Sequence, residues 1–196
     1  MPPVPSLTDT AARDGDTPET EPPRSLDIDI VYDAGDWGAL ADADKLVRVA
    51  GEAVAAELGL AASAVCVALS NDAQVAELNE SYRGKAAPTN VLSFPAGPSI
   101  PIEEGEPRFL GDVVLALETL RREAQDLGLP LEHHMQHLVV HGLLHLLGYD
   151  HHTDEEARGM ESLEVRSLAR LGVADPYATA GDPINPSGRA SQHTKP

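Results

Sequence analysis

The chain of 196 residues contains one cysteine, Cys66, and only 4% aromatic residues. A single cysteine excludes an intramolecular disulfide framework, and the shortage of aromatic side chains leaves Leu, Val and Ala to build the core. No apolar run approaches the roughly 20 residues that cross a bilayer. The acidic, proline-rich N-terminus has no basic segment followed by an apolar one, so we expect no secretory signal. These absences predict a cytoplasmic protein without a membrane partner.

Basic residues are also few, since 14 Lys and Arg stand against 32 Asp and Glu and give a formal net charge of −18. Proteins that bind polyanions without specificity usually carry an excess of Lys and Arg. The composition therefore weighs against a nucleic-acid substrate, and no DNA partner is expected. Net charge is only a mean, however, and a small basic cleft can lie on an acidic body.

Composition changes along the chain predict three segments. Residues 1–25 are rich in proline and acidic residues and have almost no large apolar side chains, which predicts a disordered N-terminal tail. Residues 175–196 have a similar character and predict a disordered C-terminal tail. Residues 26–174 remain as a single folded domain, with no internal repeat.

Within that domain the apolar pattern predicts a single α/β (α+β) domain with one sheet. Alternating or short apolar runs predict four strands, and apolar residues at helical spacing predict about five helices. The strands are expected at 26–32, 64–69, 89–94 and 112–117, with a loop at 96–108. The helices are expected at 39–58, 71–83, 118–127, 130–147 and 153–171, with Ser70 or Asn71 capping the second and Thr153 or Asp154 the last.

The helix expected at 130–147 carries His134, His137, His141 and His145 in one narrow stripe, while its C-terminal half is apolar almost all round. His141 and His145 are four residues apart, so their rings project from one face and can chelate one metal ion. Gly148 ends the helix, and His151 can then reach the same point. Three neutral imidazoles leave the fourth tetrahedral position open, which is typical of catalytic zinc sites.

The other residues near this motif have weaker roles. We expect His137 to line the cleft or support a ligand, and His133 and His134 to lie at the surface. His152 competes with His151 for the third ligand position, although the three-residue step after Gly148 favours His151. Asp150 would either accept a hydrogen bond from a ligand imidazole or cap a turn.

Gly142 makes one hydrolase class less plausible. Zinc peptidases with this His–Gly–His spacing carry Glu, the general base, directly after the first histidine. Here that position is Gly142. A peptidase with that mechanism would lack its base, so a peptidase or small-substrate zinc hydrolase remains only as an alternative.

Three further features of the sequence are the segments VHGLLHLLGYDH, LNESYRGKAAPTNVLSFP and LGDVVLA. They resemble, in that order, the histidine motif, the Arg–Lys segment and one strand of the YbeY family of bacterial metal-dependent endoribonucleases. Together with the last helix, these segments cover nearly all of residues 65–172. The resemblance implies a small mixed four-stranded sheet packed by helices around a central buried helix that carries the histidines.

The resemblance also implies a function and a set of site residues. It implies one zinc ion on His141, His145 and His151, and a catalytic arginine at Arg83. It further implies a cleft for single-stranded RNA, work on the 3′ end of 16S rRNA in ribosome biogenesis and quality control, and association with the small ribosomal subunit. One residue departs from the family pattern, because Asn90 stands where the family usually has Asp.

Three further residues have structural alternatives. Lys85 could contact the RNA backbone, Asp112 is expected mainly to support the sheet, and Cys66 is expected to be an inert core residue. In our mechanistic hypothesis, zinc polarises water or the phosphate and Arg83 clamps the phosphate. No residue is evident as the general base, so a ribosome-assembly factor with a mainly structural zinc remains an alternative function.

Overall fold

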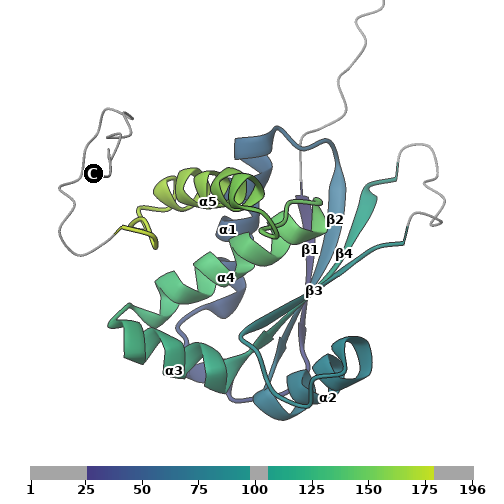
Figure 1. The fold of residues 1–196 in the computed structure, drawn as a ribbon, viewed down its shortest axis with the longest axis vertical. Helices are drawn as coiled ribbons and strands as arrows, with labels where there is room; N and C mark the ends of the chain where they lie inside the picture. Colours follow the sequence, from purple (N-terminus) through teal and green to yellow (C-terminus); the bar gives the residue numbers. More distant parts are fainter. Residues whose placement is uncertain (1–25, 98–105, 179–196) are drawn as a thin grey trace, which may run out of the picture.

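The computed structural model describes residues 26–97 and 106–178, which form one sheet with helices packed around it (Figure 1). The sheet has four strands in the order β1-β2-β4-β3. β2 lies parallel to β1 and β4, whereas β3 pairs antiparallel with β4 and forms an edge of the sheet. The expected α/β class with a mixed four-stranded sheet is therefore confirmed. Both expected tails lie largely outside the described residues, as does most of the acidic loop before β4.

The strands follow the apolar patterns of the sequence. Their bounds are β1 Leu26–Tyr32, β2 Ser63–Ser70, β3 Val91–Pro95 and β4 Arg108–Ala116. β4 begins four residues earlier than the start predicted at 112. Its first residues are extended because Arg108 and Phe109 pair with Ser63 and Ala64 of β2, a contact between distant segments that their own weak apolar pattern does not indicate.

The helices also lie close to the expected ranges. They are α1 Ala43–Leu58, α2 Asp72–Arg83, α3 Leu117–Leu127, α4 Leu131–Leu146 and α5 Asp154–Ala169. The prediction that the first helix begins at 39 is wrong, because Trp37–Ala39 form a separate 3-10 turn and Asp42 caps α1 through the amide of Lys45. Within the two described ranges, none of the helices combines the length and apolar character needed to cross a membrane.

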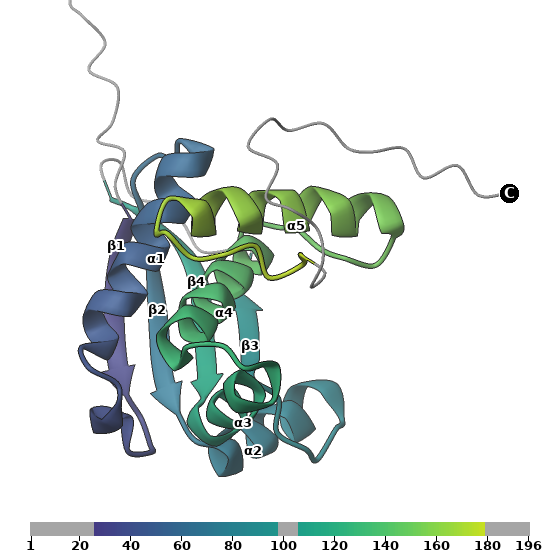
Figure 2. The same cartoon turned by 90° about the vertical axis from the view of Figure 1, so that its left-hand side faces the viewer.

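The helices are divided between the two faces of the sheet. α1 and α4 cover one face and α5 lies across them, as Figure 2 shows. On the other face, Val75 of α2 packs with Leu92, Val114 and Ala116 in a small second cluster. Because successive side chains of a strand point to opposite faces, Val113 and Leu115 of β4 belong to the main core while Val114 and Ala116 face α2.

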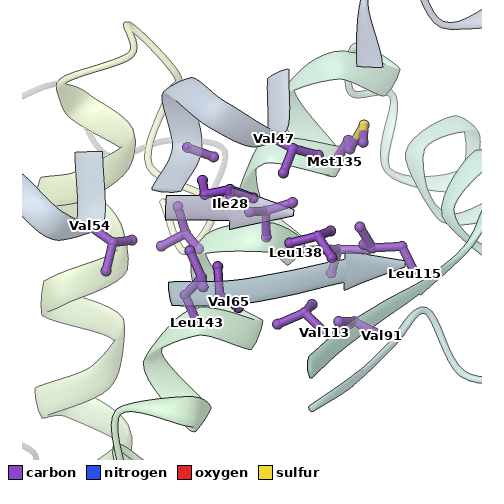
Figure 3. Close-up of a cluster of buried hydrophobic side chains, with 14 of the residues drawn as sticks. Ile28, Val47, Val54, Val65, Val91, Val113, Leu115, Met135, Leu138 and Leu143 are labelled. Carbon is purple, nitrogen blue, oxygen red and sulfur yellow. The ribbon is translucent and has the colours of Figure 1, made fainter. Parts of the chain in front are cut away.

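The main core is built almost entirely from aliphatic side chains, with Trp37 as the one aromatic residue in the described cluster. Figure 3 shows side chains of β1, β2, β4, α1 and α4 meeting between the sheet and its helices. α4 is central to this layer, because ten of its residues are buried, among them Met135, Leu138 and Leu143. This burial confirms the expected central helix, and it fixes the direction in which the histidines of α4 project.

Candidate metal centre

The imidazoles of His141, His145 and His151 converge at one point. One ring nitrogen from each residue can be chosen so that all three lie within 4.8 Å of one another, and the Nε2 atoms of His141 and His145 are 3.0 Å apart. A single tetrahedral zinc ion would hold its nitrogen ligands about 3.3 Å apart, since each Zn–N bond is about 2.0–2.1 Å. The spacing of the three side chains therefore fits one shared ion.

Hydrogen bonds fix the protonation pattern of two of these rings. Nδ1 of His145 lies 3.0 Å from the carbonyl oxygen of Tyr149, which can only accept, so this nitrogen carries the proton. Nδ1 of His141 donates in the same way to Glu164 Oε1 at 2.7 Å. In neutral rings, both Nε2 atoms then present lone pairs to each other. A cation between them satisfies both, which is the arrangement of metal-binding histidines.

Local backbone geometry brings the third histidine to this point. His141 and His145 share one face of α4, and the helix ends directly after His145. Gly148 has a φ of +90°, a region that favours glycine. The amide of Tyr149 then bonds back to the carbonyl of Leu144 at 3.0 Å. This turn reverses the chain, so that the His151 ring lies 5.1 Å from the His145 ring between centroids.

The surroundings keep His145 available as a ligand. Burial lowers the pKa of this imidazole, and the neighbouring His141 and His151 lower it further. A lowered pKa favours the neutral ring at neutral pH, and only the neutral ring offers a lone pair to a metal. The electrostatics of the cluster thus agree with its geometry.

Glu164 of α5 is a site residue that sequence reasoning missed. It is the one charged residue among the fully buried side chains of the described residues, with 1% exposure. Burial raises its pKa, but hydrogen bonds from His137, His141 and Tyr177 outweigh that effect and hold the pKa at about 2. Glu164 is therefore an anionic acceptor behind the imidazole of His141. A signal was present in the sequence, since Glu164 is a charged residue at helical spacing from Met160 and Leu168 on the buried face of α5.

A cavity of about 590 Å³ opens beside the three histidines. Arg83, the last residue of α2, lines its wall together with Asn90 and Ser93. Asp150 is the sole carboxylate among the described residues that line it. The structure thus brings Arg83 and the three histidines, far apart in sequence, to one hollow that is much less acidic than the chain as a whole.

Comparisons with known proteins agree with this arrangement. The family model for Endoribonuclease YbeY matches residues 38–172. The protein named Endoribonuclease YbeY in Rhodopseudomonas palustris (strain BisA53) is 51% identical over 159 residues, which cover 80% of this chain and 91% of that protein. Its namesake in Parvibaculum lavamentivorans is 47% identical over 158 residues, which cover 78% and 85%.

The chain belongs to the YbeY endoribonuclease family.

A solved structure is also similar to this chain, the solution structure of TM1509 from Thermotoga maritima. The identity is 25%, the match covers 78% of this chain and 99% of that one, and the TM-score is 0.47. The YbeY relatives in sequence, rather than this structure, carry the family assignment.

Two histidines of α4 lie behind the site of this YbeY family member. His137 Nε2 bonds to Glu164 Oε2 at 3.1 Å, which agrees with the expected supporting role. The prediction of a surface position for His134 is wrong, since this residue is 5% exposed and its Nε2 lies 2.9 Å from Glu123 Oε2. Its ring is buried because α3 packs against α4, which the sequence of α4 alone does not indicate. His133 is half-buried.

The turn around the third histidine separates the roles of its neighbours. Asp150 accepts a hydrogen bond from the backbone amide of His151 at 2.8 Å and pairs with His152 Nε2 at 2.8 Å. It therefore shapes the turn, and the alternative of a bond to a ligand imidazole is not seen. The His152 side chain is 80% exposed and points to Asp150, so the cluster contains His151 rather than His152.

The remaining residues considered in the sequence analysis lie outside the cluster of His141, His145 and His151. Lys85 is exposed in the loop after α2, and Asp112 lies in β4 opposite Cys66 and Phe94. Cys66 is half-buried, and burial together with Asp112 raises the pKa of its thiol, which disfavours the reactive thiolate. The side-chain oxygen of Asn90 accepts a hydrogen bond from the amide of Val91 at 2.7 Å, as a turn residue does.

Proposed function

We propose that this chain is a single-strand-specific, zinc-dependent endoribonuclease that acts in the 3′-end maturation of 16S rRNA. It would work in ribosome biogenesis and ribosome quality control, on precursor rRNA at the small ribosomal subunit, in the cytoplasm, with one zinc ion per chain. The observation that carries this proposal is that Arg83 and the imidazoles of His141, His145 and His151 line one cavity. Membership of the YbeY family supports RNA as the substrate.

The histidines and the arginine divide the chemistry between them. His141, His145 and His151 would hold zinc, which supplies Lewis-acid polarisation for phosphodiester cleavage. Arg83 offers a planar guanidinium to the non-bridging phosphate oxygens, where it orients the diester and stabilises charge that develops during cleavage. Because Arg83 lies at the exposed C-terminal end of α2, an extended RNA strand can reach it from solvent.

The cavity also reduces the difficulty posed by the net charge of −18. Its lining contains Arg83 and four histidines but only one carboxylate, and that carboxylate belongs to Asp150. Asp150 is already engaged by His152 and the amide of His151. A phosphate in the cavity therefore meets little local repulsion, although the distant acidic surface still opposes RNA through the long-range field.

The same lining limits the choice of nucleophile. Asp150 is engaged in its turn, so no carboxylate in the described wall is available as a general base. Water or the 2′-hydroxyl of the RNA remains as the nucleophile. Analysis of the new RNA ends separates them, because attack by the 2′-hydroxyl leaves a 2′,3′-cyclic phosphate and attack by water does not.

The proposal is tested with purified protein and an RNA that spans the 3′ end of precursor 16S rRNA. Wild-type protein loaded with zinc should cut the single-stranded part, and the variants His141→Ala and Arg83→Ala should not. Arg121→Ala is a matched control, since Arg121 of α3 bonds to the Asp36 carbonyl and does not line the cavity. Cleavage that survives both site substitutions would identify a contaminating nuclease. Bound zinc without any cleavage would favour the assembly-factor alternative.

A further inference from the structure

Glu164 is the point where three hydrogen-bond donors meet, two from α4 and one from the segment that follows α5. Its Oε1 accepts from Nδ1 of His141 at 2.7 Å, while its Oε2 accepts from Nε2 of His137 at 3.1 Å and from the hydroxyl of Tyr177. The bond to His141 connects Glu164 directly to the cluster of three histidines. The two bonds to Oε2 come from residues outside that cluster, so their effect on it must pass through the carboxylate.

The bonds to Oε2 determine where Oε1 points. The terminal torsion of a glutamate side chain has a broad energy profile, so the carboxylate plane is free to rotate unless both oxygens are held. Holding Oε2 fixes that plane and aims Oε1 at His141. The orientation of a metal-binding imidazole, and the choice of which nitrogen keeps its proton, depend on such a partner.

Tyr177 reaches Glu164 from the segment that follows α5. The amide of Val173 bonds back to the carbonyl of Leu168 at 3.1 Å, and the amide of Tyr177 bonds to Asp175 Oδ1 at 2.8 Å. These contacts turn the chain back along α5, as Figure 2 shows for the residues up to 178. The Tyr177 ring then lies edge-on to His137, with centroids 6.0 Å apart and an interplanar angle of 87°.

We propose that Tyr177 is a positioning residue for the metal centre, which acts through Glu164 on the orientation of His141. This inference rests on the proposed zinc site and extends it to a residue beyond the expected domain boundary at 174. The His137 bond secures the same oxygen from α4, so Tyr177 and His137 together hold Oε2 from two sides. Zinc affinity is thereby coupled to the docking of residues 175–178.

The expected effect is smaller than that of a direct partner. Removing a group that bonds directly to a ligand imidazole costs about 10–100-fold in metal affinity. Tyr177 is one bond further away and His137 remains, so Tyr177→Phe should weaken zinc binding by a smaller factor, roughly three- to tenfold. Tyr32→Phe is the matched control, because it also removes one tyrosine–carboxylate bond, to Asp44, far from the histidines.

The experiment titrates Zn²⁺ into metal-free full-length protein in competition with a chromophoric chelator. It compares wild type, Tyr177→Phe, Tyr32→Phe, Glu164→Gln and the double variant Glu164→Gln/Tyr177→Phe. Tyr177→Phe should weaken binding while Tyr32→Phe does not. Because Tyr177 acts through Glu164, its substitution should have no further effect in the Glu164→Gln variant, a non-additivity that a merely structural role does not produce.

Each outcome decides between the proposals. Zinc binding by the wild type, with unchanged affinity in Tyr177→Phe, overturns this inference and leaves the zinc site intact. Equal losses from Tyr177→Phe in the wild-type and the Glu164→Gln backgrounds also overturn it, because the loss then does not pass through the carboxylate. Failure of the wild type to bind zinc overturns both this inference and the proposed function.

Discussion

Gly142 of α4 packs directly against Val113 of β4. A Cβ atom at position 142 would lie 2.8 Å from Val113 Cγ1 and 3.2 Å from Ser93 Oγ, and the Gly142 carbonyl already accepts a hydrogen bond from Ser93 at 3.1 Å. The helix therefore approaches the sheet at the residue that follows His141. This close contact explains why the glutamate of zinc peptidases is absent here, since the position faces the sheet and has no room for a side chain.

The first prediction is that Gly142→Ala destabilises the fold. Overpacking a core costs about 1–3 kcal/mol, whereas the better helix propensity of alanine returns only about 1 kcal/mol. A net loss of roughly 1 kcal/mol, and at most about 2 kcal/mol, should therefore appear in the free energy of unfolding measured with urea. Gly159→Ala is the control, because position 159 of α5 is exposed and a Cβ there meets nothing within 4 Å. That variant should be neutral or more stable, and a stabilised Gly142→Ala would contradict the packing argument.

The features that the sequence predicts correctly are those fixed by local geometry. Alternation and helical spacing locate every strand and every α-helix of the described residues within about four positions. The convergence of the three histidines belongs to the same class, because one turn of α4 relates His141 to His145 and a short turn brings in His151. Such relationships need no knowledge of how distant segments pack.

The features that the sequence does not predict depend on contacts between distant segments. Glu164 meets His141 only because α5 crosses α4, 23 residues later in the chain. His134 is buried because α3 places Glu123 against it. A histidine on a helix can lie at the surface or be buried beside a carboxylate. The residue pattern of α4 alone therefore does not predict Glu123 and Glu164 as partners of its histidines.

The second prediction distinguishes the two adjacent histidines after Gly148. His151→Ala should lower zinc affinity at least tenfold, because it removes one of three ligands. His152→Ala should leave it nearly unchanged, since that side chain is 80% exposed and pairs with Asp150. Zinc content per chain after dialysis against a weak chelator measures both variants. If His151→Ala retained zinc and His152→Ala lost it, His152 and not His151 would be the third ligand.

The third prediction concerns the geometry of the Arg83 side chain rather than its charge. Arg83→Lys keeps the positive charge but removes the planar fork that can bind two phosphate oxygens. Cleavage of RNA should fall by about 10–1,000-fold in kcat, because transition-state contacts of this kind are worth that order of effect. Zinc affinity should stay unchanged, since Arg83 is not one of the three ligands. Arg121→Lys on α3 is the control for replacing an arginine by lysine outside the cavity. Full activity in Arg83→Lys would show that only the positive charge at position 83 is needed and would contradict the role of the planar guanidinium.

The fourth prediction concerns Asn90, the residue that departs from the family pattern. Its Nδ2 donates a hydrogen bond of 2.9 Å to Glu123 Oε2, the same oxygen that bonds to His134. Asn90→Asp would place two carboxylates at that distance, and like charges so close cannot both ionise without cost. The pair is only partly buried, so solvent screens it, and the loss in free energy of unfolding at pH 7 should be about 1 kcal/mol.

The pH dependence and a second substitution test this interpretation of Asn90. The deficit of Asn90→Asp should be present at neutral pH and should shrink as the pH falls toward about 4, where one carboxyl of the pair takes up a proton and donates to the other. Adding Glu123→Gln to that variant should restore stability at pH 7, because the glutamine amide can donate to the new carboxylate at position 90. A deficit that is independent of pH, or that Glu123→Gln does not repair, would show that repulsion between residues 90 and 123 is not its cause. In that case the cost of an aspartate at position 90 would come from the geometry of the turn before β3 and not from the carboxylate of Glu123.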